Sequence, residues 1–240
     1  MLISLSILDY EPELSAHLYS LEESEAMTAI TRIIGTGMIH RVHIDVMRPP
    51  MIPHRTAFSI ELINQIYNVL HDRIALAAHL MVSNPLQIVN RMNGFIPQNE
   101  RKDFLIILQR ESFSTEDAAL RALSLLREFG YKNGICLNLP TPCKLLTKKI
   151  VEAADEILLM TVPMGRGGQK YSEEGTRRIA YFSRMFPNKI IEVDGGITPQ
   201  TLCEAERAGA KVAVVGSFIT RHEDVTKAVL ELKRSSKCTD

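Results

Sequence analysis

Short apolar runs alternate with longer amphipathic segments along the whole of this 240-residue chain. Eight runs have the length of a strand, at residues 2–7, 41–47, 74–81, 104–109, 133–139, 156–162, 189–195 and 211–217. Strands that alternate with helices form right-handed βαβ units and a parallel sheet. Eight such units, in a chain near the roughly 250 residues typical of the fold, predict a (β/α)8 TIM barrel. An open doubly wound sheet stays an alternative, because one of the eight runs could be a false strand.

Helix signals lie between these runs. Residues 24–35 and 114–130 carry an apolar stripe and end at glycine, a common helix stop. Residues 172–186 and 198–210 show the same pattern, and Pro199 stands in the first turn of the last segment. The chain has no linker, no low-complexity tract and no repeat beyond the βα unit. We therefore expect residues 1–240 to form one barrel domain.

Composition excludes several classes of partner. The 28 basic and 28 acidic residues cancel, so no overall basic field favours nucleic acid or a membrane surface. The amino terminus lacks the pattern of a signal peptide, and no apolar run approaches the roughly 20 residues of a membrane span. The four cysteines form no CxxC pair, which is typical of reduced thiols. We expect a cytoplasmic protein.

Polar side chains stand at the carboxyl ends of the predicted strands, where a parallel barrel has its active site. His43 and Asp45 share one face of the second strand, His79 lies near the end of the third, and Asp194 closes the seventh. Two imidazoles and two carboxylates suit a divalent transition metal such as zinc, iron(II), manganese or cobalt. Each histidine alone could be an ordinary hydrogen-bonded core residue. Four such groups at strand ends favour one metal ion.

Two further groups of residues fall at the same predicted mouth. Glycines gather after the last three strands, in the segments GRGGQ (165–169), DGG (194–196) and GS (216–217). One such group would indicate only a tight turn, but three on successive loops predict a phosphate site. Met47, Met81 and Met160 point inward at strand ends and offer a soft, uncharged floor, although methionine is more often a core gap-filler.

In order along the chain, these motifs resemble the ribulose-phosphate 3-epimerase family. The resemblance spans nearly the whole sequence and is carried by SIL (6–8), HIDVM (43–47), HLMVSNP (79–85), LNLPTP (137–142), LLMTV followed by GRGGQKY (158–171), and IEVDGGITPQT (191–201). It implies a barrel of the ribulose-phosphate-binding type. It also implies an isomerase of carbohydrate metabolism that interconverts D-ribulose 5-phosphate and D-xylulose 5-phosphate, as in the pentose phosphate pathway.

The resemblance assigns roles to the residues. It implies one divalent metal and no organic cofactor, with His43, Asp45, His79 and Asp194 as ligands. Asp45 and Asp194 would be the acid and base of a 1,1-proton transfer through an enediolate. Substrate contacts are expected from Ser6, His79, Gly165, Arg166, Gly167, Gly168, Gly195, Gly196, Gly216 and Ser217, and the methionine cushion would be Met47, Met81 and Met160. The partners expected are a phosphorylated ketose and further copies of the chain, as a dimer or hexamer.

This chain departs from the family pattern in loops. Arg48 replaces the usual aspartate, and it could be an exposed loop charge or a substrate contact. Other departures are Ile52-Pro53-His54 for VPN, Pro163-Met164 for Asn-Pro or Glu-Pro, Arg166 for an apolar aromatic residue, and Gln109 for a histidine. Glu192, on the inward face of its strand, could orient a ligand histidine or simply be satisfied within the barrel.

Three other functions stay as alternatives to this epimerase. A divergent epimerase of another ketose phosphate, such as a hexulose 6-phosphate, is the first alternative. A weakly catalytic phosphosugar-binding protein is the second, although a binder would not need both aspartates. An aldolase or decarboxylase ranks lowest, because no strand carries the DxK pair that would supply a lysine.

Overall fold

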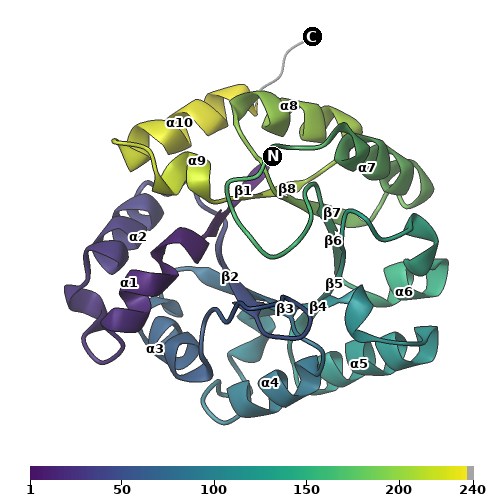
Figure 1. Cartoon of the computed structure of the whole chain (residues 1–240), viewed down its shortest axis with the longest axis horizontal. Coiled ribbons are helices and arrows are strands. Elements are labelled where there is room, and N and C mark those ends of the chain that lie inside the picture. Colours follow the sequence, from purple (N-terminus) through teal and green to yellow (C-terminus); the bar gives the residue numbers. More distant parts are fainter. Residues whose placement is uncertain (237–240) are drawn as a thin grey trace.

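The computed structural model describes residues 1–236, which form a closed parallel barrel surrounded by helices (Figure 1). The strands are β1 (Leu2–Ser6), β2 (Arg41–Met47), β3 (Ala75–Met81), β4 (Phe104–Gln109), β5 (Lys132–Leu137), β6 (Glu156–Met160), β7 (Ile190–Asp194) and β8 (Val212–Val215). They pair in sequence order, and β1 pairs with β8 to close the ring. The open-sheet alternative is therefore wrong, and all eight predicted runs contain a strand.

Helices follow the strands and cover the outside of the barrel. The α-helices are α1 (Glu11–Ala16), α2 (Glu25–Gly35), α3 (Ile60–Leu70), α4 (Pro85–Met92), α5 (Glu116–Glu128), α6 (Lys148–Ala153), α7 (Glu173–Met185), α8 (Pro199–Ala208), α9 (Ser217–Thr220) and α10 (Val225–Ser235). Short 3-10 helices are η1 (Leu8–Tyr10), η2 (Leu21–Glu23), η3 (Arg101–Asp103), η4 (Arg110–Ser112) and η5 (Cys143–Leu145).

Side-chain caps set the starts of the predicted helices. Ser24 accepts a hydrogen bond from the backbone N–H of Met27 at the start of α2, and Thr115 caps α5 in the same way. At α8, Thr198 and Thr201 cap each other's backbone N–H groups reciprocally. Each cap satisfies an N–H that has no partner within its helix.

The interior of the barrel has an apolar part and a polar part. The apolar part is a cluster of Ala77, Leu105, Ile107, Cys136, Leu158, Met160, Val162 and Val214. The polar part includes the buried side chains Ser4, Ser6, Arg41, His43, Asp45, His79, Glu156 and Glu192. Alternation along β2 produces this division, because its even-numbered apolar neighbours Ile44 and Val46 belong to the main core shared with the helices.

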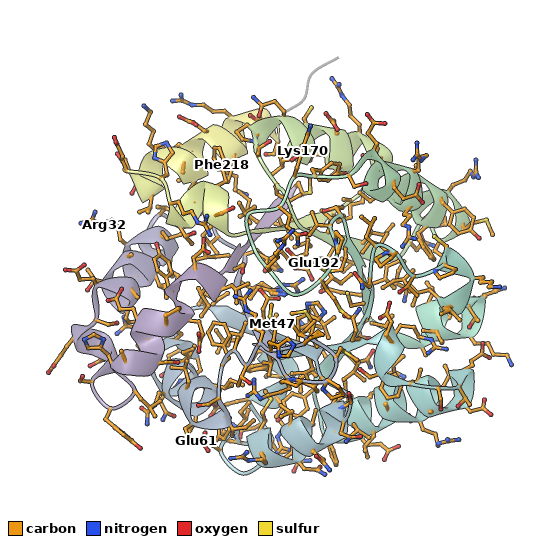
Figure 2. The ribbon with its side chains drawn as sticks, in the orientation of Figure 1. Arg32, Met47, Glu61, Lys170, Glu192 and Phe218 are labelled. Atoms are coloured by element: carbon orange, nitrogen blue, oxygen red, sulfur yellow. The ribbon has the colours of Figure 1, made fainter. Side chains whose placement is uncertain are left out.

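A three-residue ion cluster lies inside the barrel beneath the mouth. Arg41 binds Glu156 through two hydrogen bonds of 2.7 and 3.0 Å, and its Nη2 lies 2.8 Å from Oε2 of Glu192. Glu192 is completely buried, and Figure 2 shows its side chain within the ring of helices. The burial of Glu192 raises the cost of its charge, so Arg41 is needed to compensate it.

The cysteine and membrane expectations have different outcomes. Cys136 and Cys143 are free, but Cys203 is disulfide-bonded, so the expectation of a reduced thiol is wrong there; Cys238 lies outside the described residues. The absence of a CxxC motif excludes only a bridge within such a motif. Within residues 1–236, no helix combines the length and apolar character needed to cross a membrane.

Replacing Arg41 with methionine is expected to destabilise the fold strongly. The change leaves the carboxylates of Glu156 and Glu192 in the barrel without their cation, a loss of about 3–5 kcal/mol in the free energy of unfolding. Urea unfolding of the chelator-treated protein measures it. Arg91→Met is the matched control, because the Arg91–Glu61 pair is more than half exposed and is worth only about 0.2–1 kcal/mol. Equal losses in the two variants would contradict this account of the cluster.

Candidate functional site

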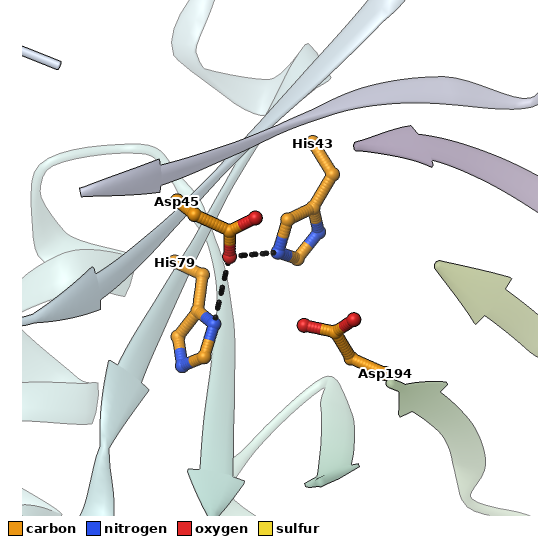
Figure 3. A group of neighbouring side chains, drawn as sticks. All are labelled: His43, Asp45, His79 and Asp194. Atoms are coloured by element: carbon orange, nitrogen blue, oxygen red, sulfur yellow. Dashed lines mark ion pairs between the residues drawn. The ribbon is translucent and has the colours of Figure 1, made fainter. Parts of the chain in front are cut away.

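Three strands bring four polar side chains together at the mouth of the barrel. Parallel register sets Asp45 of β2 beside His79 of β3, and Ser6 of β1 beside His43. Asp194, at the end of β7, faces them from another side of the mouth (Figure 3). One ligand atom from each of His43, Asp45, His79 and Asp194 lies within 4.8 Å of all the others. The predicted convergence of these four residues is therefore present in the structure.

Four atoms of this group are buried without a hydrogen bond, and three of them lie close together. Nε2 of His43 lies 3.3 Å from Oδ1 of Asp45, and Nδ1 of His79 lies 3.4 Å from the same oxygen. These two nitrogens and this oxygen have no hydrogen-bond partner. Since buried polar atoms are normally satisfied, their convergence indicates a ligand that accepts electron pairs from all of them.

The electrostatics of the group favour a cation. Burial would lower the pKa of His43, but the carboxylate of Asp45 outweighs burial and raises that pKa to about 9. Burial and the charge of Asp45 raise the pKa of Asp194 above its usual range. Burial opposes ionisation of Asp45 as well, yet His43 and His79 hold its pKa well below the usual range. Only the shift of His43 runs against the effect of burial, and it indicates a negative potential at this point, which a divalent cation would offset.

The chemistry of the donor set fits a divalent transition metal. Two neutral imidazoles and two carboxylates supply four donors and a charge of about −2, which balances the charge of a divalent ion. The set includes hard oxygen and borderline nitrogen donors, which zinc, iron(II), manganese and cobalt all accept. The described residues contain no other group of histidine, cysteine and acidic side chains that meets the same spacing.

Neighbouring polar side chains hold the group in place. The hydroxyl of Ser6 donates to Oδ2 of Asp45 at 3.0 Å, and the ring of His79 contacts Oε1 of Gln109 through Nε2 at 2.7 Å. Oε1 of Glu192 lies 4.0 Å from Nδ1 of His43, beyond hydrogen-bond distance. Glu192 therefore forms an ion pair with Arg41 and faces His43 without a hydrogen bond that would orient that ring.

A cleft of about 600 Å³, open solvent included, lies above these side chains. The predicted site residues that line it are Ser6, Asp45, Met47, Met81, Met160, Gly165, Arg166, Gly167, Gly168, Asp194, Gly195, Gly196, Gly216 and Ser217. His43 and His79 are completely buried below. Sequence reasoning missed Leu8, Asp9, Val162, Gln169, Ile197 and Val214, which complete the lining. Asp9 could have been found as a carboxylate just after β1.

The glycines allow the three loops to approach each other closely. Gly196 has a φ of +67°, and a Cβ there would lie 2.3 Å from the backbone nitrogen of Tyr171. Gly195 has a φ of +118° and would clash with Val162 in the same way. Side chains at these two positions would separate the loop after β7 from the loop after β6. The resulting concave backbone surface suits a phosphate group.

The loop after β2 is tied together by Arg48. Its guanidinium donates to the carbonyl oxygens of Met47, Ala57 and Phe58, at 2.5 to 2.7 Å. These hydrogen bonds hold the two ends of the loop together. Phe58, at the second end, has a positive φ of 55°. Arg48 is thus neither a free surface charge nor a residue of the cleft lining.

The same loop reaches across the mouth to the glycine-rich loop. Arg55 donates to the carbonyl oxygen of Gly165 at 2.8 Å. Ile52 is buried, and a Cβ on Gly165 would lie 3.2 Å from its Cγ2 atom. Two of the departures from the family pattern, at Arg48 and Ile52, therefore shape the loops over the cleft.

The sequence is similar to those of known proteins over most of its length. A sequence profile of the ribulose-phosphate 3 epimerase family matches residues 13–220. The chain is 31% identical over 214 residues to a ribulose-phosphate 3-epimerase of Helicobacter pylori, with 88% of this chain and 93% of that protein covered. It is 30% identical over 198 residues to the ribulose-phosphate 3-epimerase of Aquifex aeolicus, with coverages of 80% and 82%.

Solved structures show the same fold at low identity. A 3-keto-L-gulonate-6-phosphate decarboxylase from Vibrio cholerae superposes with a TM-score of 0.67 at 11% identity, over 98% of this chain and 96% of that one. An orotidine 5'-phosphate decarboxylase from Pyrococcus horikoshii gives 0.64 at 14% identity, over 99% and 100%. At these identities the likeness shows the barrel fold alone.

Protein stripped with a chelator and reloaded with zinc is expected to hold one ion per chain. His79→Leu should lower the zinc content severalfold, because it removes one of four donors and leaves the buried carboxylate of Asp45 less compensated. Elemental analysis after desalting measures this content. His71→Leu is the control, since His71 is a partly exposed histidine beside Asp72, outside the cleft. Full zinc content in His79→Leu, or none in the parent protein, would contradict the assignment.

Proposed function

This chain belongs to the ribulose-phosphate 3-epimerase family, and from that premise we propose that it inverts C3 of a ketose phosphate. The proposed substrate pair is D-ribulose 5-phosphate and D-xylulose 5-phosphate. The observation that carries this proposal is the approach of Asp45 and Asp194 from β2 and β7 to one point of the cleft. Inversion needs a proton to leave one face of C3 and another to arrive at the opposite face.

The four converging side chains would hold one divalent metal ion. When bound, the ion would act as a Lewis acid that increases the acidity of the proton beside the ketone. Asp45 would take the C3 proton from one epimer while the carboxyl group of Asp194 donates a proton to the opposite face. In the reverse reaction, the two residues would exchange these roles. Ser6 fixes one oxygen of Asp45 by its hydrogen bond and would lie beside the sugar. The reaction would pass through a planar enediolate.

The glycine loops would bind the phosphate. All of the proposed phosphate-binding residues line the cleft, which supports this assignment: Gly165, Gly167, Gly168, Gly195, Gly196, Gly216 and Ser217. Arg166, an exposed cation of the same lining, would attract the dianion. Binding energy from this remote group would support turnover as well as affinity.

Met47, Met81 and Met160 would form an apolar floor next to the reacting carbon. All three are nearly completely buried and line the cleft. Their thioethers would exclude water from the reacting carbon, which strengthens electrostatic interactions with the aspartates.

A second candidate keeps this chemistry and changes the sugar to a hexulose 6-phosphate. The observation in its favour is that Ile52 and Arg55 both contact Gly165 and so join the loop after β2 to the loop after β6. Both loops border the cleft and differ from the family pattern. Their shape would decide the length of sugar that fits.

A panel of ketose phosphates and matching free sugars tests the function. Metal-loaded protein is expected to act on ribulose 5-phosphate, and to act at least 100-fold less efficiently on ribulose, because the glycine loops offer binding energy that only a phosphate can use. Coupled assays of kcat/KM measure both. A clear preference for hexulose 6-phosphate would select the second candidate, and equal efficiency on ribulose would contradict the phosphate assignment.

Exchange in deuterated water tests the two aspartates separately. Asp194→Asn should stop net epimerisation and still exchange the C3 proton of one epimer through Asp45, and Asp45→Asn should label the other epimer. Mass spectrometry of recovered substrate gives the label, and metal content must be measured in parallel because each aspartate is also a proposed ligand. Asp72→Asn, at a side chain that is 88% exposed, should behave as the parent protein. Label in both epimers from a metal-loaded single variant would show that one base serves both faces.

A further inference from the structure

A buried glutamine contacts one of the four converging histidines. Gln109, the last residue of β4, is completely buried, and its Oε1 lies 2.7 Å from Nε2 of His79. On the other side, its Nε2 donates to Oε2 of Glu111 at 2.6 Å. A carboxylate can only accept hydrogen bonds, so Glu111 requires the amide NH2 group to face it. The amide oxygen of Gln109 must therefore face His79.

This orientation decides which nitrogen of His79 carries the proton. The amide oxygen only accepts, so Nε2 of His79 must be the donor. A neutral imidazole has one N–H, which leaves a free electron pair on Nδ1. That nitrogen is the one that lies 3.4 Å from Asp45, is buried and has no hydrogen bond. The free electron pair thus points to the position where the four donors converge.

Glu111 is itself fixed by the backbone. Its Oε1 accepts a hydrogen bond from the N–H of Asn138 at 3.0 Å, just after β5. The side-chain oxygen of Asn138 accepts from the N–H of Met164 at 2.9 Å, at the start of the glycine-rich loop. A chain of hydrogen bonds therefore connects this histidine to the loop after β6, and no member of the chain can rotate alone without losing a partner.

We propose that Gln109 and Glu111 are positioning residues that hold His79 in the tautomer able to bind a metal. The inference rests on the proposed metal site and extends it to residues that do not touch the ion. His43 has no equivalent support, because Glu192 lies 4.0 Å from its outer nitrogen. His79 is thus the ligand whose orientation is fixed before any ion arrives, and removing its partner should weaken metal binding.

The test compares three variants in two measurements. Gln109→Met keeps the length of the side chain and removes the acceptor. Glu111→Gln keeps the shape and lets the amide of Gln109 turn either way. Gln87→Met is the matched control, since Gln87 is exposed on α4. The first measurement is zinc affinity by calorimetry, and the second is the ¹⁵N NMR signature of the His79 ring in metal-free protein, assigned with His79→Gln.

The parent protein and Gln87→Met are expected to show the Nε2–H tautomer and equal zinc affinity. Gln109→Met should weaken zinc binding about 10- to 100-fold and mix the tautomers, and Glu111→Gln should give a smaller effect in the same direction. Unchanged affinity and an unchanged NMR signature in both variants would overturn the inference. A parent protein that binds no zinc would instead overturn the proposed function, and the NMR measurement, which needs no metal, would still decide the tautomer.

Discussion

Pairing between β1 and β8 closes the sheet, and the geometry of the site depends on this closure. In a closed parallel barrel the carboxyl ends of all eight strands surround one opening. Asp194 ends β7, three strands away from the Asp45 strand by way of β8 and β1, yet the two carboxylates converge with both histidines. In an open sheet the carboxyl ends of the strands form a row, so the ends of β2 and β7 would not face each other across one opening.

Charge imposes the second constraint. The barrel buries acidic groups at two levels, and each level needs a cation. Arg41 supplies it for Glu156 and Glu192, within hydrogen-bond distance of both. At the mouth, the raised pKa of His43 shows that the group around Asp45 has excess negative charge, which fits the metal proposed there. The buried carboxylates thus explain why one position has an arginine and the other has converging histidines.

The loops connect the site to the substrate cleft. Gly195 and Gly196 permit close packing between the loops after β6 and β7, and Arg55 joins the loop after β2 to Gly165. Arg48 uses its donors within its own loop. Among the departures from the family pattern, Arg166 lines the cleft, Ile52 and Arg48 belong to a loop beside it, and Gln109 contacts His79. None of them replaces one of the four converging side chains.

The sequence alone determined the strand count, the inward face of each strand and the residues at strand ends, because strand alternation and turn signals are local. On that basis His43, Asp45, His79 and Asp194 could be predicted as one group. The contacts of Arg48 and Gln109 and the disulfide of Cys203 were decided only by the tertiary structure. The hydrogen bonds of Arg48 to Phe58 and the contact of Gln109 with His79 depend on which atoms the folded loop and the adjacent strands bring within reach, and no local pattern encodes those distances.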